Sequence, residues 1–415
     1  MYYFLLIAVL LLSAPLSAQT PDEQLRTGLV ALQSNNLPDA LSALQQAKDV
    51  ASNDVRVRLA LAETYRLLDR PQDAEQETTA VAKMAEENPA LLRGLSIYFE
   101  NAGDAAEAAR IESSYTQYFP DDLSGFGRAA TFYLEAGDAS NAAEFAMSGL
   151  ERREMASLYE ILAAAQAQLG RDQEAAEAFR GAIRLKPYDE GIRYHLAYLS
   201  LRRQDFDQGL QVLDEARELF DKSPRIELAR GTALYGLRRF DEAIESFLKA
   251  ARLAPGAAQP HYFLGRMIEH SGDRLVDILE RQRAFAEAQP DSYLGSFLYG
   301  QALLASLPPS DDPAAYEQSA QVLRRSVELK NDYWESHFEL GQALERQKRY
   351  EEAQTELERA VELNPQSSKP QYRLSRVYTR LGKTELAEAA RKKHAELTET
   401  EREAIGSGLT PLAQP

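Results

Sequence analysis

The sequence contains no cysteine, which excludes a disulfide framework, a thiol nucleophile and a lipid-modified cysteine. Histidine is scarce, with 5 residues in 415, and none stands in the H-E-x-x-H spacing of metalloproteases. The glycine-rich phosphate-binding motifs G-x-G-x-x-G and G-x-x-x-x-G-K-[ST] are also absent. We therefore expect no cofactor, no metal site and no catalytic residue, and a protein that is not an enzyme.

Basic residues are outnumbered: 47 Lys and Arg face 64 Asp and Glu, for a formal net charge of −17. Nucleic acids and anionic membrane surfaces are bound mainly through Lys and Arg. The charge balance therefore disfavours both as partners, and we expect no nucleic acid to bind.

The first 18 residues lack any charged side chain, and their most apolar part, Tyr2 to Leu12, is too short to span a bilayer of ~30 Å. This stretch predicts a signal peptide over residues 1–18 with cleavage after Ala18, although Leu16 and the missing basic residue near Met1 depart from the usual pattern. We expect an exported protein, in the periplasm or secreted, with no membrane span after cleavage. An uncleaved N-terminal membrane anchor is the alternative.

The remainder of the chain is a repeat with a period close to 34 residues. "LRRFDEAIESFLKAARLAP", which begins at Leu237, has close relatives that begin at Leu169 and Gln347. Extending this register gives eleven units, and only the interval after Tyr293 is long, at 41 residues. The units begin at Pro21, Val55, Pro89, Leu123, Ala156, Glu190, Pro224, Ala258, Tyr293, Trp334 and Ser368.

Small residues recur within each unit. The eighth place is Gly, Ala or Ser in every unit, as at Gly231 and Gly341, and the twentieth place is small in every unit but that of Asp277. Helices that pack at about 8–10 Å need small residues where they cross. We therefore expect each unit to be a pair of helices that meet at these two places.

Glycine and proline mark the ends of the predicted helices. Glycines fall between the two helices, where a helix often ends in a left-handed residue, and prolines such as Pro255 follow the second helix. The expected left-handed glycines are Gly103, Gly137, Gly170, Gly272 and Gly382.

The period and these columns resemble the tetratricopeptide (TPR) repeat family, and the resemblance covers about residues 19–402. It implies an all-α fold, a right-handed α-solenoid of about eleven helix-turn-helix units with a concave groove, and a disordered tail over 403–415. The family's groove is lined by the first helix of each unit, so the resemblance also implies protein or peptide segments as partners.

Two units depart from the pattern. In the unit that begins at Ala258, Asp277 and Arg281 occupy apolar places, so we expect the inner face of that second helix to be rotated by one residue. In the next unit, the insertion "LPPSDDP" at 307–313 interrupts the helices. It is either a functional loop, which reaches a partner or places Asp311 and Asp312 at a cation, or a tolerated surface insertion.

The groove positions of the first helices become aromatic and then basic along the chain. They predict a candidate binding stripe of aromatic residues at Tyr194, Tyr198, Tyr235, Tyr262, Phe297, Phe338 and Tyr372. The alternative is that some of these rings pack into the seam between neighbouring first helices. The same positions near the C-terminal end predict a basic cluster at Arg346, Lys369, Arg373, Arg376 and Arg380. This cluster could bind an acidic peptide, a terminal carboxylate or an acidic glycan, or it could balance Glu385, Glu388 and the tail.

These expectations leave three functions. The first is an exported scaffold or adaptor that mediates protein-protein interaction in the assembly of cell-envelope or secretion machinery. The second is a polysaccharide-associated module in exopolysaccharide export or modification, in which the aromatic residues stack on sugars. The third, an enzyme with a site assembled across units, has no motif to support it.

Overall fold

The computed structural model describes residues 21–308 and 312–406, and within these ranges every element is helical. Contacts between Cα atoms divide the chain into two compact units, Met1–Leu199 and Ser200–Pro415. Each unit is described by itself. The predicted signal peptide at 1–18, its cleavage after Ala18 and the tail beyond residue 406 lie outside the described residues.

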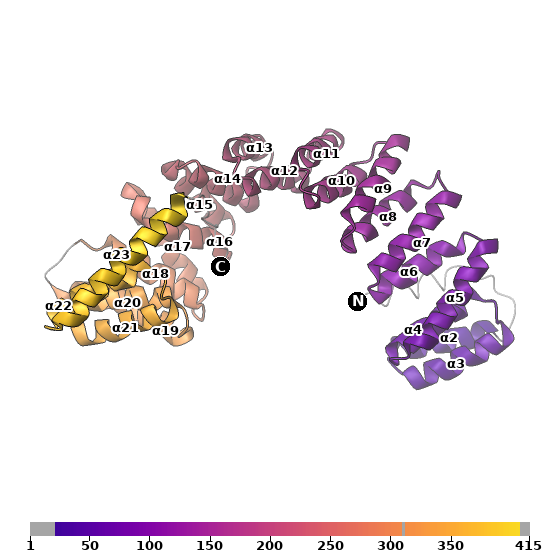
Figure 1. Cartoon of the computed structure of the whole chain (residues 1–415), viewed down its shortest axis with the longest axis horizontal. Coiled ribbons are helices and arrows are strands. Elements are labelled where there is room, and N and C mark those ends of the chain that lie inside the picture. Colours follow the sequence, from indigo (N-terminus) through magenta and orange to yellow (C-terminus); the bar gives the residue numbers. More distant parts are fainter. Residues whose placement is uncertain (1–20, 309–311, 407–415) are drawn as a thin grey trace. The chain divides into compact units, whose positions relative to one another are not determined.

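The N-terminal unit is a series of helix pairs, each packed on the next (Figure 1). Its helices are α2 (Pro21–Gln33), α3 (Leu37–Val50), α4 (Val55–Leu67), α5 (Pro71–Glu87), α6 (Leu91–Ala102), α7 (Ala105–Tyr118), α8 (Leu123–Glu135), α9 (Ala139–Arg152), α10 (Ala156–Gln168) and α11 (Asp172–Leu185). The next helix, α12 (Glu190–Arg202), contains the boundary between the two units.

The C-terminal unit repeats this arrangement, with interruptions in its middle (Figure 1). Its α-helices are α13 (Phe206–Leu219), α14 (Pro224–Gly236), α15 (Phe240–Leu253), α16 (Ala258–Arg266), α17 (Leu275–Ala288), α18 (Tyr293–Ser306), α19 (Glu317–Leu329), α20 (Trp334–Arg346), α21 (Tyr350–Leu363), α22 (Ser368–Arg380) and α23 (Thr384–Gly406). The short 3-10 helices are η1 (Ile268–His270), η2 (Gly272–Arg274) and η3 (Pro313–Tyr316). The predicted all-α solenoid of helix pairs is thus confirmed within each unit.

The small residues of the eighth place lie where the paired helices cross. A Cβ atom added to Gly341 on α20 would stand 2.6 Å from Leu357 Cγ on α21, and one added to Gly231 on α14 would stand 2.5 Å from the ring of Phe247 on α15. Real Cβ atoms do not approach that closely, so these helices pack at their observed distance only because the side chain is missing. Leu357 and Phe247 are fully buried, as the repeat pattern predicts.

The turn between paired helices contains one residue with left-handed backbone. All five glycines expected there have positive φ, between 48° at Gly272 and 82° at Gly137. Five further turns use a non-glycine residue with φ between 54° and 62°: Asn35, Asp69, Gln204, Arg238 and Lys348. The turn geometry is therefore common to units that differ in sequence at this place.

The unit that begins at Ala258 departs from the others as expected. Asp277 on α17 is exposed, while Ile278, Gln282 and Phe285 are buried, so the inner face of α17 is displaced by one residue from the repeat register. The first helix of this unit, α16, is also shortened to 9 residues and continues as η1 and η2.

The insertion between α18 and α19 is described only at its two ends. Asp311 lies outside the described residues, whereas the Asp312 carboxylate accepts a hydrogen bond from Ala314 N–H at 3.0 Å and begins η3. Tyr316 follows in the core, and its hydroxyl donates to the Pro308 carbonyl at 3.2 Å. This hydrogen bond joins the two described ends of the insertion.

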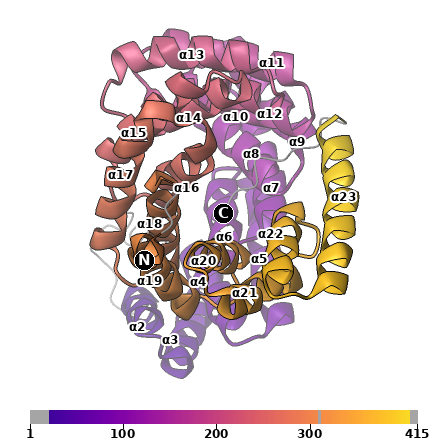
Figure 2. The same ribbon diagram turned by 90° about the vertical axis from the view of Figure 1, so that its left-hand side faces the viewer.

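Helix α23 ends the described chain and, at 23 residues, is longer than its partner α22, beside which it lies in Figure 2. Ala387, Ala390 and Leu397 bury one face of it, while its other side is polar and exposed. The buried side of α23 covers the apolar face of α22, which would otherwise be open to water.

Candidate functional site

The N-terminal unit contains the first two residues of the predicted aromatic stripe. Tyr194 and Tyr198 lie one turn apart on α12, with their rings stacked at a centroid distance of 6.1 Å. Tyr198 is 48% exposed. The two rings thus form a small aromatic platform that solvent reaches.

In the C-terminal unit the predicted stripe is discontinuous, because two of its rings are buried. Phe297 and Phe338 are only 4% and 8% exposed and belong to the core of this unit. The ring of Tyr333, in the loop before α20, covers Phe297 edge-on at 5.2 Å. Tyr262 packs against the same core, while Tyr235 is half-buried. Tyr372, at 46%, is the most exposed of the predicted aromatic residues in this unit.

The predicted basic cluster is largely paired with carboxylates. Glu345 on α20 holds Arg373 at 3.3 Å and Arg376 at 3.0 Å, and Glu269 lies 3.5 Å from Lys369. Arg346 Nη1 donates to the carbonyl of Leu304 at 3.2 Å. Glu345 and Glu269 thus pair with three of the five basic residues of the cluster.

Glu339 on α20 lies near Gln301 of α18 and near the basic residues Lys369 and Arg373 of α22. Its carboxylate accepts hydrogen bonds from Gln342 Nε2 at 2.7 Å and from Gln301 Nε2 at 3.3 Å. Burial raises the pKa of Glu339 to about 7, against the lowering effect of the Gln301 hydrogen bond and of Lys369 and Arg373. The charge of this inner surface therefore changes near neutral pH.

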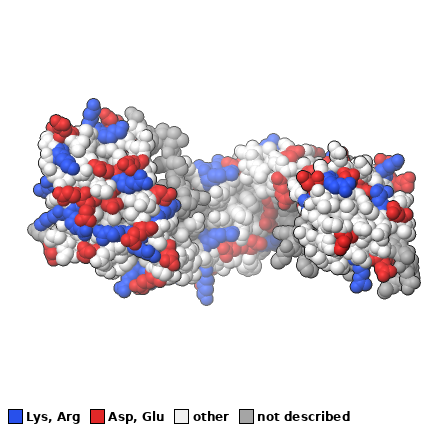
Figure 3. Space-filling view, turned by 90° about the horizontal axis from the view of Figure 1, so that it is seen from below, with Lys and Arg blue, Asp and Glu red and all other residues white. Residues whose placement is uncertain are grey.

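The remaining candidates for chemistry have structural partners. His261 Nδ1 lies 3.2 Å from Gln282 Oε1, and His337 Nδ1 lies 2.6 Å from Glu356 Oε2. Across residues 21–308 and 312–406, no group of three or more His, Asp or Glu side chains is placed to hold a metal ion. Acidic and basic side chains alternate over the face seen in Figure 3, without a large patch of one sign on the C-terminal unit.

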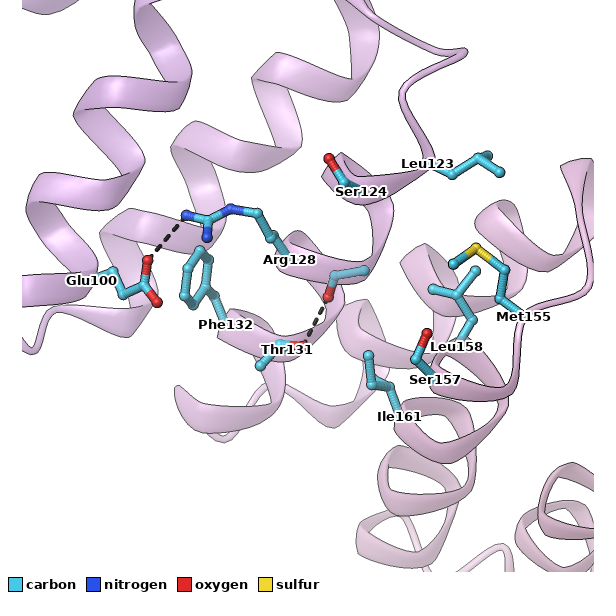
Figure 4. A pocket seen from close by; sticks show the side chains of 11 residues that line it. Glu100, Leu123, Ser124, Arg128, Thr131, Phe132, Met155, Ser157, Leu158 and Ile161 are labelled. Atoms are coloured by element: carbon cyan, nitrogen blue, oxygen red, sulfur yellow. Dashed lines mark hydrogen bonds and ion pairs between the residues drawn. The ribbon is translucent and has the colours of Figure 1, made fainter. Parts of the chain in front are cut away.

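A hollow of about 400 Å³ opens on the first helices of the N-terminal unit (Figure 4). We call it the α8 hollow, and it lies between α8 and α10 with α6 at one end. Its lining is mostly apolar, with three hydroxyl groups and one ion pair. The lining residues are Glu100, Leu123, Ser124, Gly127, Arg128, Thr131, Phe132, Met155, Ser157, Leu158 and Ile161.

The charged end of the α8 hollow is held by a network between helices. Arg128 Nη2 lies 3.1 Å from Glu100 Oε2, and its guanidinium covers the ring of Phe132 at 4.9 Å (Figure 4). The same guanidinium contacts Glu112, a fully buried carboxylate on α7 that also pairs with Arg93 at 3.0 Å. The contact with Glu112 therefore fixes the Arg128 guanidinium on its buried side, whereas the Glu100 side chain is 44% exposed.

The repeat register did not indicate this hollow, because it lies outside the predicted aromatic and basic residues. One signal was present in the sequence: Gly127 stands at the fifth place of its unit, which is not one of the two small columns. A glycine away from the helix crossing needs another explanation than helix packing.

Comparison with protein families identifies the repeat. Tetratricopeptide-repeat models match residues 25–78, 156–189, 194–258, 228–273 and 334–367. These segments lie in both units, but they leave out α18 and α22, which carry Phe297, Tyr372 and most of the basic cluster. No curated protein matches the sequence.

Several solved structures are similar to this chain at low sequence identity. Yeast Tom70 is 16% identical, with 93% of this chain and 94% of that chain covered and a TM-score of 0.38. The C-terminal part of a TPR repeat-containing protein from Cytophaga hutchinsonii is 13% identical, with 66% of this chain and 96% of that chain covered and a TM-score of 0.43. A thermophilic TPR protein in Thermus thermophilus is 21% identical, with 45% of this chain and 96% of that chain covered and a TM-score of 0.38. The family assignment rests on the repeat models.

None of the helices in the described part of the chain is both long and apolar enough to cross a membrane.

Proposed function

We propose that this tetratricopeptide-repeat protein, a scaffold for protein-protein interaction, binds segments of its partners in the α8 hollow. One observation carries the proposal: the hollow is formed by the first helices α6, α8 and α10 and by Met155 just before α10, and its floor is apolar. An extended segment gains affinity there by burying apolar side chains, and the hydroxyl groups at the rim can bond its backbone.

The proposal places this scaffold outside the cytoplasm, in the periplasm or secreted, where it assists the assembly of cell-envelope or secretion machinery. The uncharged apolar stretch at the N-terminus supports export. The absence of cysteine is compatible with an oxidising compartment, because no thiol can form an unwanted disulfide.

A second candidate function is the binding of an acidic peptide or glycan at the C-terminal end. Tyr372 and Arg376 would contact this ligand, since their side chains are about half exposed. An acidic ligand would have to compete with Glu345 for Arg376. Its binding would weaken steeply with salt, and Arg376→Glu would abolish it. Sugar stacking in exopolysaccharide export or modification would instead respond to Tyr372→Ala and Tyr198→Ala with little effect of salt.

Site-specific photo-crosslinking tests the proposal. A photoreactive amino acid is placed at Ser157, which is exposed and lines the α8 hollow, or at Met147 on α9, which is 45% exposed and outside it. After irradiation of the envelope fraction, cross-linked proteins are identified by mass spectrometry. We expect defined partners from Ser157 and none of them from Met147, whereas the same partners from both positions would contradict a binding site in the hollow.

A further inference from the structure

Gly127 lies in the interior of α8, where glycine destabilises a helix by roughly 0.5–1 kcal/mol relative to alanine. A Cβ atom added there would meet only Leu158 Cδ2, at 3.8 Å, which is an ordinary van der Waals distance. The fold therefore has room for a side chain at this position. The space that the side chain would fill belongs to the α8 hollow.

Most other glycines inside the described helices have a packing reason. Gly28, Gly181, Gly231, Gly300 and Gly341 would each bring a Cβ within 2.7 Å of a neighbouring side chain. Gly94 on α6 resembles Gly127, since its Cβ would meet only Leu59 at 3.7 Å, but it does not line the hollow. Gly94 thus offers a matched control for Gly127.

The ion-pair network that includes the charged end of the hollow has one more carboxylate than it has guanidinium groups. Ion pairs connect the carboxylates of Glu100, Glu112 and Asp122 to only two guanidinium groups, those of Arg93 and Arg128. Glu112 is fully buried, so Glu100 is the carboxylate that an arriving group would meet at this end. A Lys or Arg beside it would complete the network, and the net charge of −17 favours a basic partner over an acidic one.

From these observations we infer that the α8 hollow is specific for an apolar-basic segment of a partner protein. One large apolar side chain of the segment lies on Gly127, beside Leu158, and a Lys or Arg of the same segment pairs with Glu100. Gly127 is then a specificity-determining residue, because its missing side chain provides the space for the partner. The inference rests on the proposed function and names the chemistry of its ligand.

Peptide selection on the full chain tests it. A phage-displayed library of random dodecapeptides is selected on the immobilised protein, and enriched peptides are synthesised with a fluorescent label and titrated by anisotropy. We expect peptides with Leu, Ile, Met or Phe close to Lys or Arg. Gly127→Leu should weaken their binding about tenfold or more, whereas Gly94→Leu should change it less than about twofold.

Two further variants keep the test sharp. Ser157→Trp fills the hollow from α10 and should also abolish binding, even if Gly127→Leu alters α8. Glu100→Gln should weaken binding severalfold and reduce its dependence on salt. Far-UV circular dichroism and thermal unfolding monitor the fold of each variant.

The outcomes separate the two proposals. Failure to enrich any peptide contradicts the proposed function and with it the inference. Peptides that lose binding in Ser157→Trp but tolerate Gly127→Leu, or that are acidic, overturn the inference alone and leave binding in the hollow. Peptides that tolerate both variants bind at another site and contradict the proposed function as well.

Discussion

The carboxylate of Glu401 on α23 caps Ser368, the first residue of α22: Oε1 accepts from the Ser368 backbone N–H at 2.9 Å and Oε2 from its hydroxyl at 2.7 Å. The first N–H groups of a helix have no partner within the helix, so a side chain from a neighbouring helix satisfies one here. The last helix thus stabilises the start of the helix before it, besides covering its apolar face.

Loss of this cap should loosen the C-terminal end of the solenoid. We expect Glu401→Ala to cost about 1 kcal/mol, as other N-cap removals do, and to raise hydrogen exchange in the first turn of α22. The control is Glu399→Ala, which removes an exposed pair with Arg402 and should cost only a few tenths of a kcal/mol. Equal exchange in both variants would show that Glu401 does not cap α22 in solution.

The same substitution should have opposite effects at two glycines. Gly231→Ala forces a Cβ against the buried ring of Phe247 and should destabilise the C-terminal unit by about 1–3 kcal/mol. Gly127→Ala meets open space and should stabilise α8 by about 0.5–1 kcal/mol. Denaturant unfolding with hydrogen exchange on α14 and α8 measures both, and destabilisation by Gly127→Ala would show that this glycine has a packing role.

Buried and exposed ion pairs on α7 should differ in strength. Glu112→Gln leaves Arg93 and Arg128 facing a neutral amide in a buried site, and we expect a cost of about 3 kcal/mol. Glu107→Gln removes a local pair with Arg110 and should cost about 0.5 kcal/mol or less. Thermal unfolding of the two variants checks this, and comparable losses would indicate that the buried network contributes little.

Protonation of Glu339 should couple stability to pH. Its pKa is raised from 4.5 to about 7 in the folded protein, so the folded state binds more protons than the unfolded state between these values. The free energy of unfolding should therefore fall as pH rises through this window, by about 1–3 kcal/mol from this group.

Glu339→Gln isolates that contribution, because the amide stays neutral at every pH. Relative to the wild type, the variant should gain stability as pH rises from 5 to 8, as measured by urea unfolding at several pH values. Burial also raises the pKa of Glu335, but that residue is common to both proteins and cancels in the difference. Parallel profiles for the two proteins would mean that Glu339 is ionised throughout.

The sequence by itself determined the repeat and its internal packing. Small residues at Gly231 and Gly341, and large ones at Phe247 and Leu357, recur because each helix pair must fit its neighbour in the same way, and the period records that requirement. The one-residue displacement of α17 was also visible, since Asp277 broke an otherwise apolar place.

The tertiary structure decided which side chains of the first helices remain open to solvent. Phe297 and Phe338 stand at groove positions, yet they are buried, and Phe297 is covered by Tyr333, a loop residue outside the repeat pattern. Arg373 and Arg376 on α22 are paired because Glu345, on α20 of the preceding repeat, lies within ion-pair distance of both. Such contacts depend on residues that do not repeat, so the period carries no information about them.

The α8 hollow is decided in the same way. Gly127 can be read from the sequence. Whether the space beside it is filled by a neighbouring side chain or left open depends on how far Leu158 of the next repeat extends toward it. The repeat fixes the distance between helices, and the individual side chains on facing helices fix the shape of the space between them.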